Sequence, residues 1–183
     1  MKRFERALDL KKLLGKNSMF LFGPRGVGKS FLIRETLPEA KIYNLLDDEV
    51  FHKLLRRPKT IEDELGKSTR VVVIDEIQKL TKLLHEVHRM IEERRIRFLL
   101  TGSSARKLRH GGANLLAGRA WESHLYPLTY LEIDSFDLNR YLNVGGLPRV
   151  YLSKDPREEL KAYVRTYLME EIKAEARSEE HTS

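Results

Sequence analysis

The 183-residue sequence contains no cysteine, and this absence removes two classes of structure. Without cysteine the chain forms no disulfides and offers no thiolate ligands to a metal ion. Its six histidines are scattered. His85 and His88 share one predicted helix, but no carboxylate or third histidine accompanies them at the spacing of a metal site. We therefore expect no zinc-type structural centre.

Long hydrophobic runs are also missing. No run approaches the roughly 20 apolar residues of a membrane-spanning helix. The first six residues, MKRFER, lack the apolar segment of a signal peptide. We expect no membrane association and a cytoplasmic location.

Charge is plentiful and mostly basic. Hydrophobic residues make up 41% and charged residues 33% of the chain, a composition typical of a globular domain, and the net charge is +7. A basic surface favours nucleic acid as a partner. A solvated basic face is the alternative, because no recognition helix, aromatic platform or zinc module is visible in the sequence.

The most informative segment reads GPRGVGKS, from Gly23 to Ser30. This is the G-x-x-x-x-G-K-[ST] pattern of a phosphate-binding loop, between an apolar run and an apolar-periodic helix. Successive backbone N–H groups in such a turn surround a phosphate, and glycine permits the positive φ that the turn needs. The helix that follows adds unpaired N–H groups. The predicted nucleotide-binding residues are Gly23, Pro24, Arg25, Gly26, Val27, Gly28, Lys29, Ser30 and Phe31.

A second motif, VVVIDE, covers residues 71–76. We predict that Lys29 contacts the β- and γ-phosphates and that Ser30 and Asp75 hold Mg²⁺. Glu76 would orient and deprotonate the attacking water. A strand end that caps a helix is the alternative for the two acids, and the loop upstream disfavours it.

The glutamate beside Asp75 indicates an ATPase with an additional strand between the loop strand and the Asp strand. We assign residues 41–45 to that strand. The Asn-Lys-x-Asp motif of GTPases is absent, as is the arginine-rich lid of small-molecule kinases. ATP is therefore the expected ligand, with Mg²⁺ as cofactor.

Apolar periodicity predicts the remaining elements. Strands are expected at 18–22, 41–45, 70–74, 97–101 and 121–125. Helices are expected at 4–15, 29–37, after Asp47-Asp48, from Thr60 in a capping box, and at 79–94. This alternation predicts an α/β P-loop NTPase fold, with a five-stranded, mainly parallel sheet of order 5-1-4-3-2 between helices. Ligands bind at the carboxyl ends of such strands, where both motifs lie.

After Pro127 only helical patterns remain. We expect an ATPase core over 1–126 and an incomplete, lid-like helical segment over 127–176. Its last apolar stripe, at 160–172, is wide enough to need a partner surface. The final residues, 177–183, have no apolar side chain. They read like a translated sequencing adaptor, so we expect a non-native tail on a truncated chain.

Several segments together resemble one family. They are FGPRGVGKS, VVVIDEIQKL, FLLTGSSARKL, LLAGRAWESHLYPLTYLEI, YLNVGGLPRVYL and YVRTYLMEEIKAEA. In order and spacing, over nearly all of residues 1–176, they resemble the bacterial and archaeal AAA family ATPases of the AAA domain 14 type, within the AAA+/STAND-like group. Members typically continue into a second domain, which in some descriptions looks related to restriction-endonuclease-like folds.

The resemblance implies further site residues. Ser103 matches a polar residue that would contact the γ-phosphate or the attacking water, although it could simply cap the next helix. Arg119 resembles an arginine that contacts a phosphate in cis or from a neighbouring subunit, although it could be paired at the start of the fifth strand. Pro148, in a Gly-Gly-Leu-Pro segment, resembles a proline that packs on adenine. A plain loop is its alternative.

Three functions remain open at this stage. The first is an ATP-hydrolysing module that drives a missing C-terminal domain or acts within a homo-oligomer. The second is a nucleotide-dependent switch for DNA or a protein partner, with little turnover. The third is an inert fragment that has the family fold.

Overall fold

The computed structural model describes residues 4–66, 69–105, 108 and 116–169. The chain divides into two compact units. The sheet unit comprises Leu8–Pro24 and Gly28–Tyr126, and the helical unit comprises the residues up to Ala7, Arg25–Val27 and those from Pro127 onward. The predicted tail at 177–183 lies outside the described residues. Each unit is described by itself below.

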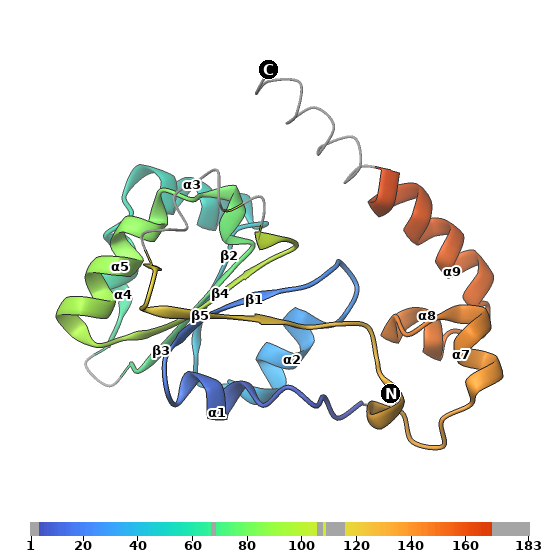
Figure 1. Ribbon diagram of the computed structural model, residues 1–183. Helices are drawn as coiled ribbons and strands as arrows, with labels where there is room; N and C mark the ends of the chain where they lie inside the picture. Colours follow the sequence, from blue (N-terminus) through green and yellow to red (C-terminus); the bar gives the residue numbers. More distant parts are fainter. Residues whose placement is uncertain (1–3, 67–68, 106–107, 109–115, 170–183) are drawn as a thin grey trace. The chain divides into compact units, whose positions relative to one another are not determined.

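The sheet unit is built on five parallel strands in the order β2-β3-β4-β1-β5. The strands are β1 (Ser18–Phe22), β2 (Lys41–Asn44), β3 (Val71–Asp75), β4 (Arg97–Gly102) and β5 (Ala120–His124). The predicted order is the same sheet read from its other edge, so the fold class and strand order are confirmed (Figure 1).

The predicted order is correct, but the assignment of residues 41–45 to the additional strand between the loop strand and the Asp strand is wrong. The strand between β1 and β3 is β4, whereas β2 lies at the edge of the sheet. Burial gives the physical reason. Only Tyr43 of β2 is buried, whereas five of the six residues of β4 are buried. A central strand of a parallel sheet must be apolar on both faces, and of β2 and β4 only β4 meets that requirement.

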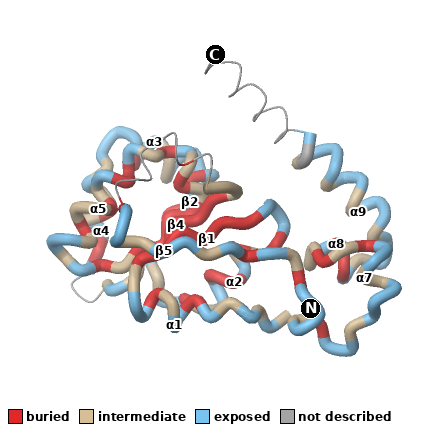
Figure 2. Tube along the Cα trace, viewed as in Figure 1, coloured by how far each residue is buried: buried red, intermediate tan, exposed pale blue. Residues whose placement is uncertain are grey.

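Helices cover both faces of the sheet. Figure 1 shows α3 (Asp48–Arg56), α4 (Thr60–Glu64) and α5 (Leu83–Arg94) on one face, and α1 (Leu10–Leu14) and α2 (Lys29–Thr36) on the other. Alternate strand residues point to opposite faces. Phe20, Phe22, Val72, Ile74, Phe98 and Leu100 accordingly join the core beneath α3, α4 and α5. The buried strands at the centre of the unit are visible in Figure 2.

Two helix starts and one helix cap were wrongly predicted. The helix expected over 4–15 covers only α1, which begins after Asp9 accepts a hydrogen bond from the Lys12 amide. The helix expected over 79–94 is interrupted, with a 3₁₀ turn at Ile77–Lys79 (η1) before α5. Thr60 does not cap α4, because the cap residue is Lys59. For the first two helices, apolar spacing predicted the helix but not the residue at which it begins. The short helix α4 begins at Thr60, as predicted, and only its capping box is wrong.

The helical unit contains no strand among its described residues. Its elements are η3 (Tyr130–Glu132), α7 (Leu138–Val144), α8 (Pro148–Leu152), α9 (Pro156–Tyr163) and a π-helical stretch, η4 (Val164–Leu168). Their core is Leu128, Ile133, Val144, Val150 and Tyr151. Residues 170–172 of the predicted apolar stripe lie outside the described part of the chain.

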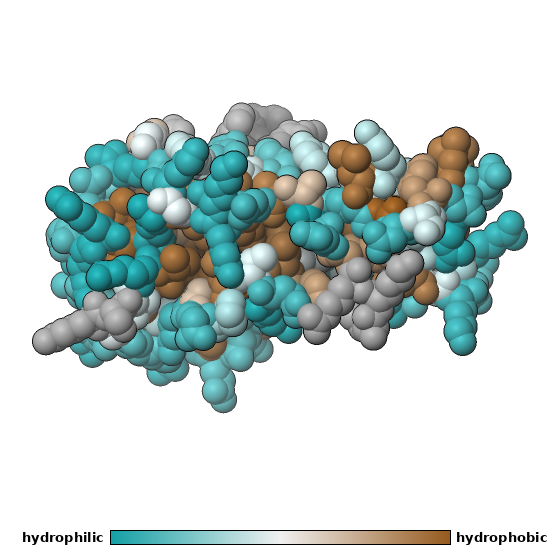
Figure 3. Space-filling model, turned by 90° about the horizontal axis from the view of Figure 1, so that it is seen from below, coloured by the Kyte–Doolittle hydropathy of each residue, from teal (hydrophilic) through white to brown (hydrophobic). Residues whose placement is uncertain are grey.

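Surface character is mixed. In the face drawn in Figure 3, hydrophilic side chains predominate and smaller hydrophobic areas lie between them. In the helical unit, Leu131 and Leu142 are both 74% exposed. Across the described residues no helix is long and apolar enough to cross a membrane.

Glu132 ties residues 6–7 to the rest of the helical unit. Its Oε1 accepts hydrogen bonds from Arg6 Nε at 3.0 Å and from the Ala7 amide at 2.8 Å, and its Oε2 accepts one from the Thr129 amide at 2.9 Å. Burial raises the pKa of this carboxyl, but the hydrogen bonds from Ala7, Thr129 and Arg6 together outweigh burial and hold the pKa below its ordinary value.

A carboxyl with a lowered pKa stabilises the folded state above its unfolded pKa of about 4.3, and that stability is lost as the pH falls through the folded pKa. We expect Glu132→Gln to lower the free energy of unfolding by about 1–3 kcal/mol at pH 7. The difference from wild type should shrink towards pH 3, as urea titrations at the two pH values can show.

The control is Glu158→Gln. Glu158 also bonds a cation, Lys161, but its side chain is 64% exposed, against 6% for Glu132. An exposed ion pair contributes little, so this variant should unfold like wild type. Equal losses of stability at pH 7 and pH 3 in Glu132→Gln would contradict the electrostatic account.

Candidate functional site

The predicted phosphate loop connects β1 to α2. Its glycines have the backbone conformation that the motif requires, with φ of 80° at Gly26 and 96° at Gly28. Gly28 is the N-cap of α2 and has no side chain with which to cap the helix. The first N–H groups of α2, from Lys29 onward, are therefore not capped by a side chain, as in helix N-termini that bind anions.

Lys29 is buried, with a residue exposure of 6%. Its Nζ donates to the carbonyl oxygens of Gly23 at 2.6 Å and of Pro24 at 3.2 Å. These bonds fold the side chain back along its own loop and keep the ammonium among backbone dipoles. A buried cation held in this way is ready to meet a phosphate oxygen, because its desolvation is already offset by the two carbonyls.

The two sequence motifs meet at Asp75. Ser30 Oγ donates to Asp75 Oδ2 at 3.0 Å, across 45 residues of sequence. Asp75 is 8% exposed and ends β3, next to β4 in the sheet. The parallel sheet brings the two residues together, because β1 and β3 both run towards the edge that carries the loop.

Thr101 is a site residue that the sequence analysis did not identify. It is fully buried near the end of β4, and its Oγ1 donates to Asp75 Oδ1 and accepts a hydrogen bond from the Glu76 amide at 3.1 Å. Thr101 thus orients both acids at once. The available signal was a hydroxyl that ends an otherwise apolar run, Phe98-Leu99-Leu100, beside the Asp strand.

Glu76 has an unusual backbone conformation, with φ of 62° and ψ of 45°. A non-glycine residue in this left-handed region costs about 1–3 kcal/mol and is frequent at functional sites. The turn directs the chain from β3 into η1. The Glu76 carboxylate accepts a hydrogen bond from Gln78 Nε2.

The residues present fit a magnesium ion. Ser30 Oγ and Asp75 Oδ2 are neutral and anionic oxygen donors 3.0 Å apart at the loop, the donor types that Mg²⁺ prefers alongside phosphate oxygens. Among the described residues no cluster of three or more His, Asp or Glu side chains forms an all-protein metal site. A magnesium ion would therefore complete its coordination with phosphate oxygens and water.

Ser103 follows β4 and is partly exposed, one residue beyond Gly102. It lies at the edge of the sheet to which the strands carrying the loop and Asp75 run. Its predicted contact with the γ-phosphate stays a prediction. From the end of β4, it is the Thr101 hydroxyl that contacts Asp75.

Arg119 precedes β5 and lies at the amino-terminal edge of the sheet. Ala120 pairs with Ser18, whereas the loop begins after Phe22, which pairs with His124. About five residues of strand, roughly 15 Å, therefore separate Arg119 from the loop edge. The Arg119 side chain is paired with Glu92. This placement disfavours a phosphate contact in cis and fits the alternative, an arginine that is paired at the start of β5. A phosphate contact from a neighbouring copy stays a prediction.

We expect Arg119→Ala to leave ATP turnover unchanged at protein concentrations at which the chain is monomeric. Loss of the exposed pair with Glu92 should cost less than about 1 kcal/mol of stability. Turnover per chain, measured over a wide range of protein concentration, checks this. A drop at every concentration would contradict the placement, and a drop only at high concentration would indicate a contact between copies.

Of the remaining predicted residues, Phe31 lies in α2 of the sheet unit and is exposed, whereas Arg25–Val27 and Pro148 belong to the helical unit. Pro148 is the first residue of α8, where its missing N–H is not needed. In the loop tip, Arg25 stacks over the Tyr167 ring at 5.0 Å, and the Val27 carbonyl accepts a bond from Arg6 at 2.7 Å. The predicted packing of Pro148 on adenine stays a prediction.

One comparison with a known structure supports the fold. The chain is similar to the replication initiator DnaA bound to AMPPCP and single-stranded DNA, with 14% identity, a TM-score of 0.56, and coverage of 92% of this chain and 63% of that one. It also matches the Aeropyrum pernix ORC1 protein in complex with DNA, with 17% identity, a TM-score of 0.48, and coverage of 67% and 44%. A variant of Thermotoga maritima RuvB gives 22% identity, a TM-score of 0.46, and coverage of 67% and 45%. The chain thus spans less than two thirds of each.

No curated protein matches the chain. A family comparison is more decisive. Residues 15–134 match the family model described as AAA domain, and this region carries the loop, Asp75, Glu76 and Thr101. The match confirms the resemblance inferred from the sequence segments, and the chain belongs to the AAA domain family.

Proposed function

We propose that this chain binds Mg·ATP at the loop from Gly23 to Ser30 and hydrolyses its terminal phosphoanhydride bond. The observation that carries the proposal is the convergence on Asp75 of Ser30 from α2 and Thr101 from β4. The sheet edge that carries the loop holds the Ser30 hydroxyl, the buried Asp75 carboxylate and the buried Lys29. Together they could bind a metal-bound triphosphate.

The chain's own residues have separate tasks in this proposal. The loop amides and Lys29 bind the β- and γ-phosphates, and Ser30 and Asp75 hold the metal ion. Magnesium, when bound, would neutralise charge on the phosphate oxygens. Glu76 accepts the proton of the attacking water as general base.

Calorimetric titration tests the binding step. We propose ATP and GTP as paired ligands in the presence of Mg²⁺, because the chain lacks the guanine motif of GTPases. ATP should bind in the micromolar range or tighter, and GTP should bind more weakly. Equal affinity for both nucleotides would contradict the assignment of ATP, and the absence of any binding would contradict the site.

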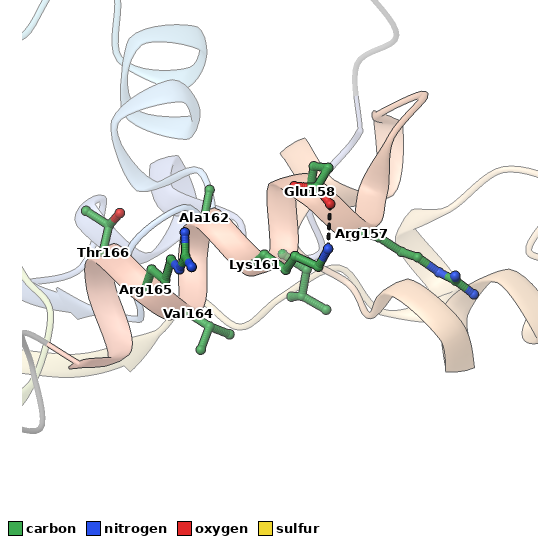
Figure 4. A pocket seen from close by; sticks show the side chains of 8 residues that line it. Arg157, Glu158, Lys161, Ala162, Val164, Arg165 and Thr166 are labelled. Atoms are coloured by element: carbon green, nitrogen blue, oxygen red, sulfur yellow. Dashed lines mark hydrogen bonds and ion pairs between the residues drawn. The ribbon is translucent and has the colours of Figure 1, made fainter.

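A nucleotide-dependent switch for nucleic acid is the second candidate. One observation favours it besides the net charge. A pocket of the helical unit is lined along α9 and η4 by three basic residues, Arg157, Lys161 and Arg165 (Figure 4). Lys161 donates to Glu158 at 2.6 Å. Basic side chains in series can follow a phosphate backbone.

Multiple-turnover phosphate release, with and without DNA, separates the two candidates. Steady release without DNA supports an autonomous ATPase. Tight ATP binding with release below about one turnover per hour, together with DNA affinity that changes on adding ATP, supports the switch. Any role of this activity in driving a further domain or a homo-oligomer belongs to the same proposal and rests on the family resemblance.

A further inference from the structure

Gln78 is the residue beside the site whose placement the proposed function does not explain. It lies in η1, two residues beyond Glu76, and its Nε2 donates to Glu76 Oε2. Its other amide atom, Oε1, is buried and has no hydrogen-bond partner among the described residues. A buried polar atom without a partner costs about 1–3 kcal/mol, so it needs a reason to persist.

The orientation of the Gln78 amide follows from Glu76. Turning the amide over would place Oε1 against the Glu76 carboxylate, and two acceptors repel each other. The amide therefore keeps Nε2 on Glu76 and leaves Oε1 unpartnered. The bond to the carboxylate is charge-assisted, and such bonds are about twice as strong as neutral ones.

Gly102 makes room for this arrangement. A Cβ on Gly102, at the end of β4, would lie 2.8 Å from Gln78 Oε1 and 3.6 Å from its Cδ. Carbon and oxygen atoms do not approach so closely without displacement of one of them. Gly102 does not have a positive φ, so its backbone does not require glycine there. Glycine is required at position 102 because a side chain there would occupy the space of the Gln78 amide.

We propose that Gln78 is a positioning residue for ATP hydrolysis, which holds the Glu76 carboxylate in the orientation needed to accept a proton from the attacking water, and that Gly102 provides the space for the Gln78 amide. The inference rests on the proposed role of Glu76 as general base. Thr101 fixes the Glu76 backbone and Gln78 fixes its side chain, so the strained turn at Glu76 is held at both ends.

Steady-state kinetics test the proposal with two single variants and their combination. Gln78→Ala should lower kcat about 10- to 100-fold and leave the KM for ATP within about threefold, because a misplaced base affects the reaction and not binding. Gly102→Ala should lower kcat in the same way by displacing the amide. In the double variant, Gly102→Ala should add no further loss, because the amide it displaces is gone.

Nuclear magnetic resonance supplies a readout that needs no ATP. The side-chain amide resonances of Gln78 should move in Glu76→Ala relative to wild type, because the amide loses its charged acceptor. Unchanged resonances would overturn the inference whether or not the chain is an ATPase. This arm also decides the question if Gln78→Ala does not fold.

The kinetic outcomes separate the inference from the proposed function. If the wild-type chain hydrolyses ATP and Gln78→Ala has an equal or higher kcat, the inference about Gln78 is overturned, but the proposed function is not. Losses that multiply in the double variant also overturn it, since Gly102 would then act independently of Gln78. A wild-type chain with no hydrolysis overturns the proposed function, and with it the role of Gln78.

Discussion

Lys29→Ala should severely weaken ATP binding. The lysine is buried in the loop and is held by the Gly23 and Pro24 carbonyls. In the proposed function it is the cation that would contact the phosphates directly. Removal of one partner from a buried, hydrogen-bonded charge pair costs about 2–5 kcal/mol. ATP affinity, measured by calorimetry, should therefore fall about 30-fold to several thousandfold.

The control for this variant is Lys11→Ala, which removes an exposed lysine from α1. Both variants should fold, as thermal melting can show, because alanine is a good helix former. Equal ATP affinity in wild type and Lys29→Ala would contradict the binding site. A loss shared by Lys11→Ala would point to net charge and not to the loop.

Glu76→Gln should separate binding from hydrolysis. Glutamine keeps the size of the side chain but is a far weaker base, so kcat should fall about 100- to 10,000-fold. ATP affinity should stay within about threefold, because the loop, Lys29 and Asp75 are unchanged. The measurement is phosphate release at saturating ATP, alongside a binding titration of the same variant.

The control for Glu76→Gln is the same substitution at an exposed glutamate, Glu39. Glu39→Gln, in the turn between α2 and β2, changes charge by the same amount and should leave kcat unchanged. Glu76→Gln with a wild-type kcat would show that another group accepts the proton. A large loss of affinity in Glu76→Gln would instead assign Glu76 to binding.

Parts of the site could be predicted from the sequence where the required conformation or burial restricts the residue type. Only glycine adopts φ of 80° and 96° without strain, so the positions of Gly26 and Gly28 mark the loop directly. A run as apolar as Val71–Ile74 has to be buried, which places Asp75 at a strand end. The parallel order of the strands then brings the loop and the acid together.

Thr101 and Gln78 could not be predicted in the same way. Their roles depend on which strand lies next to β3, and that neighbour, β4, comes from more than 20 residues later in the chain. Threonine is common in strands whatever its function, so its type alone carries no signal. The expected order 5-1-4-3-2 already set β4 beside β3, but a strand order does not specify which side chains at the strand ends hydrogen-bond to one another.

The start of the first helix and the place of Arg119 also depend on long-range contacts, which the sequence does not show. Arg6 and Ala7 lie outside α1 and donate hydrogen bonds to Glu132, which is more than 120 residues away in the chain. Arg119 resembles a phosphate-binding arginine by its local motif. The register of β5 against β1 nevertheless places it at the opposite edge from the loop.

The most direct test of the account is the identity of the nucleotide that remains bound after incubation with excess Mg·ATP. Each protein would be separated rapidly from free nucleotide, and the bound fraction resolved by chromatography. The account predicts ADP on wild type, ATP on Glu76→Gln and no nucleotide on Lys29→Ala. ADP on Glu76→Gln in the wild-type proportion, or nucleotide retained by Lys29→Ala, would contradict it.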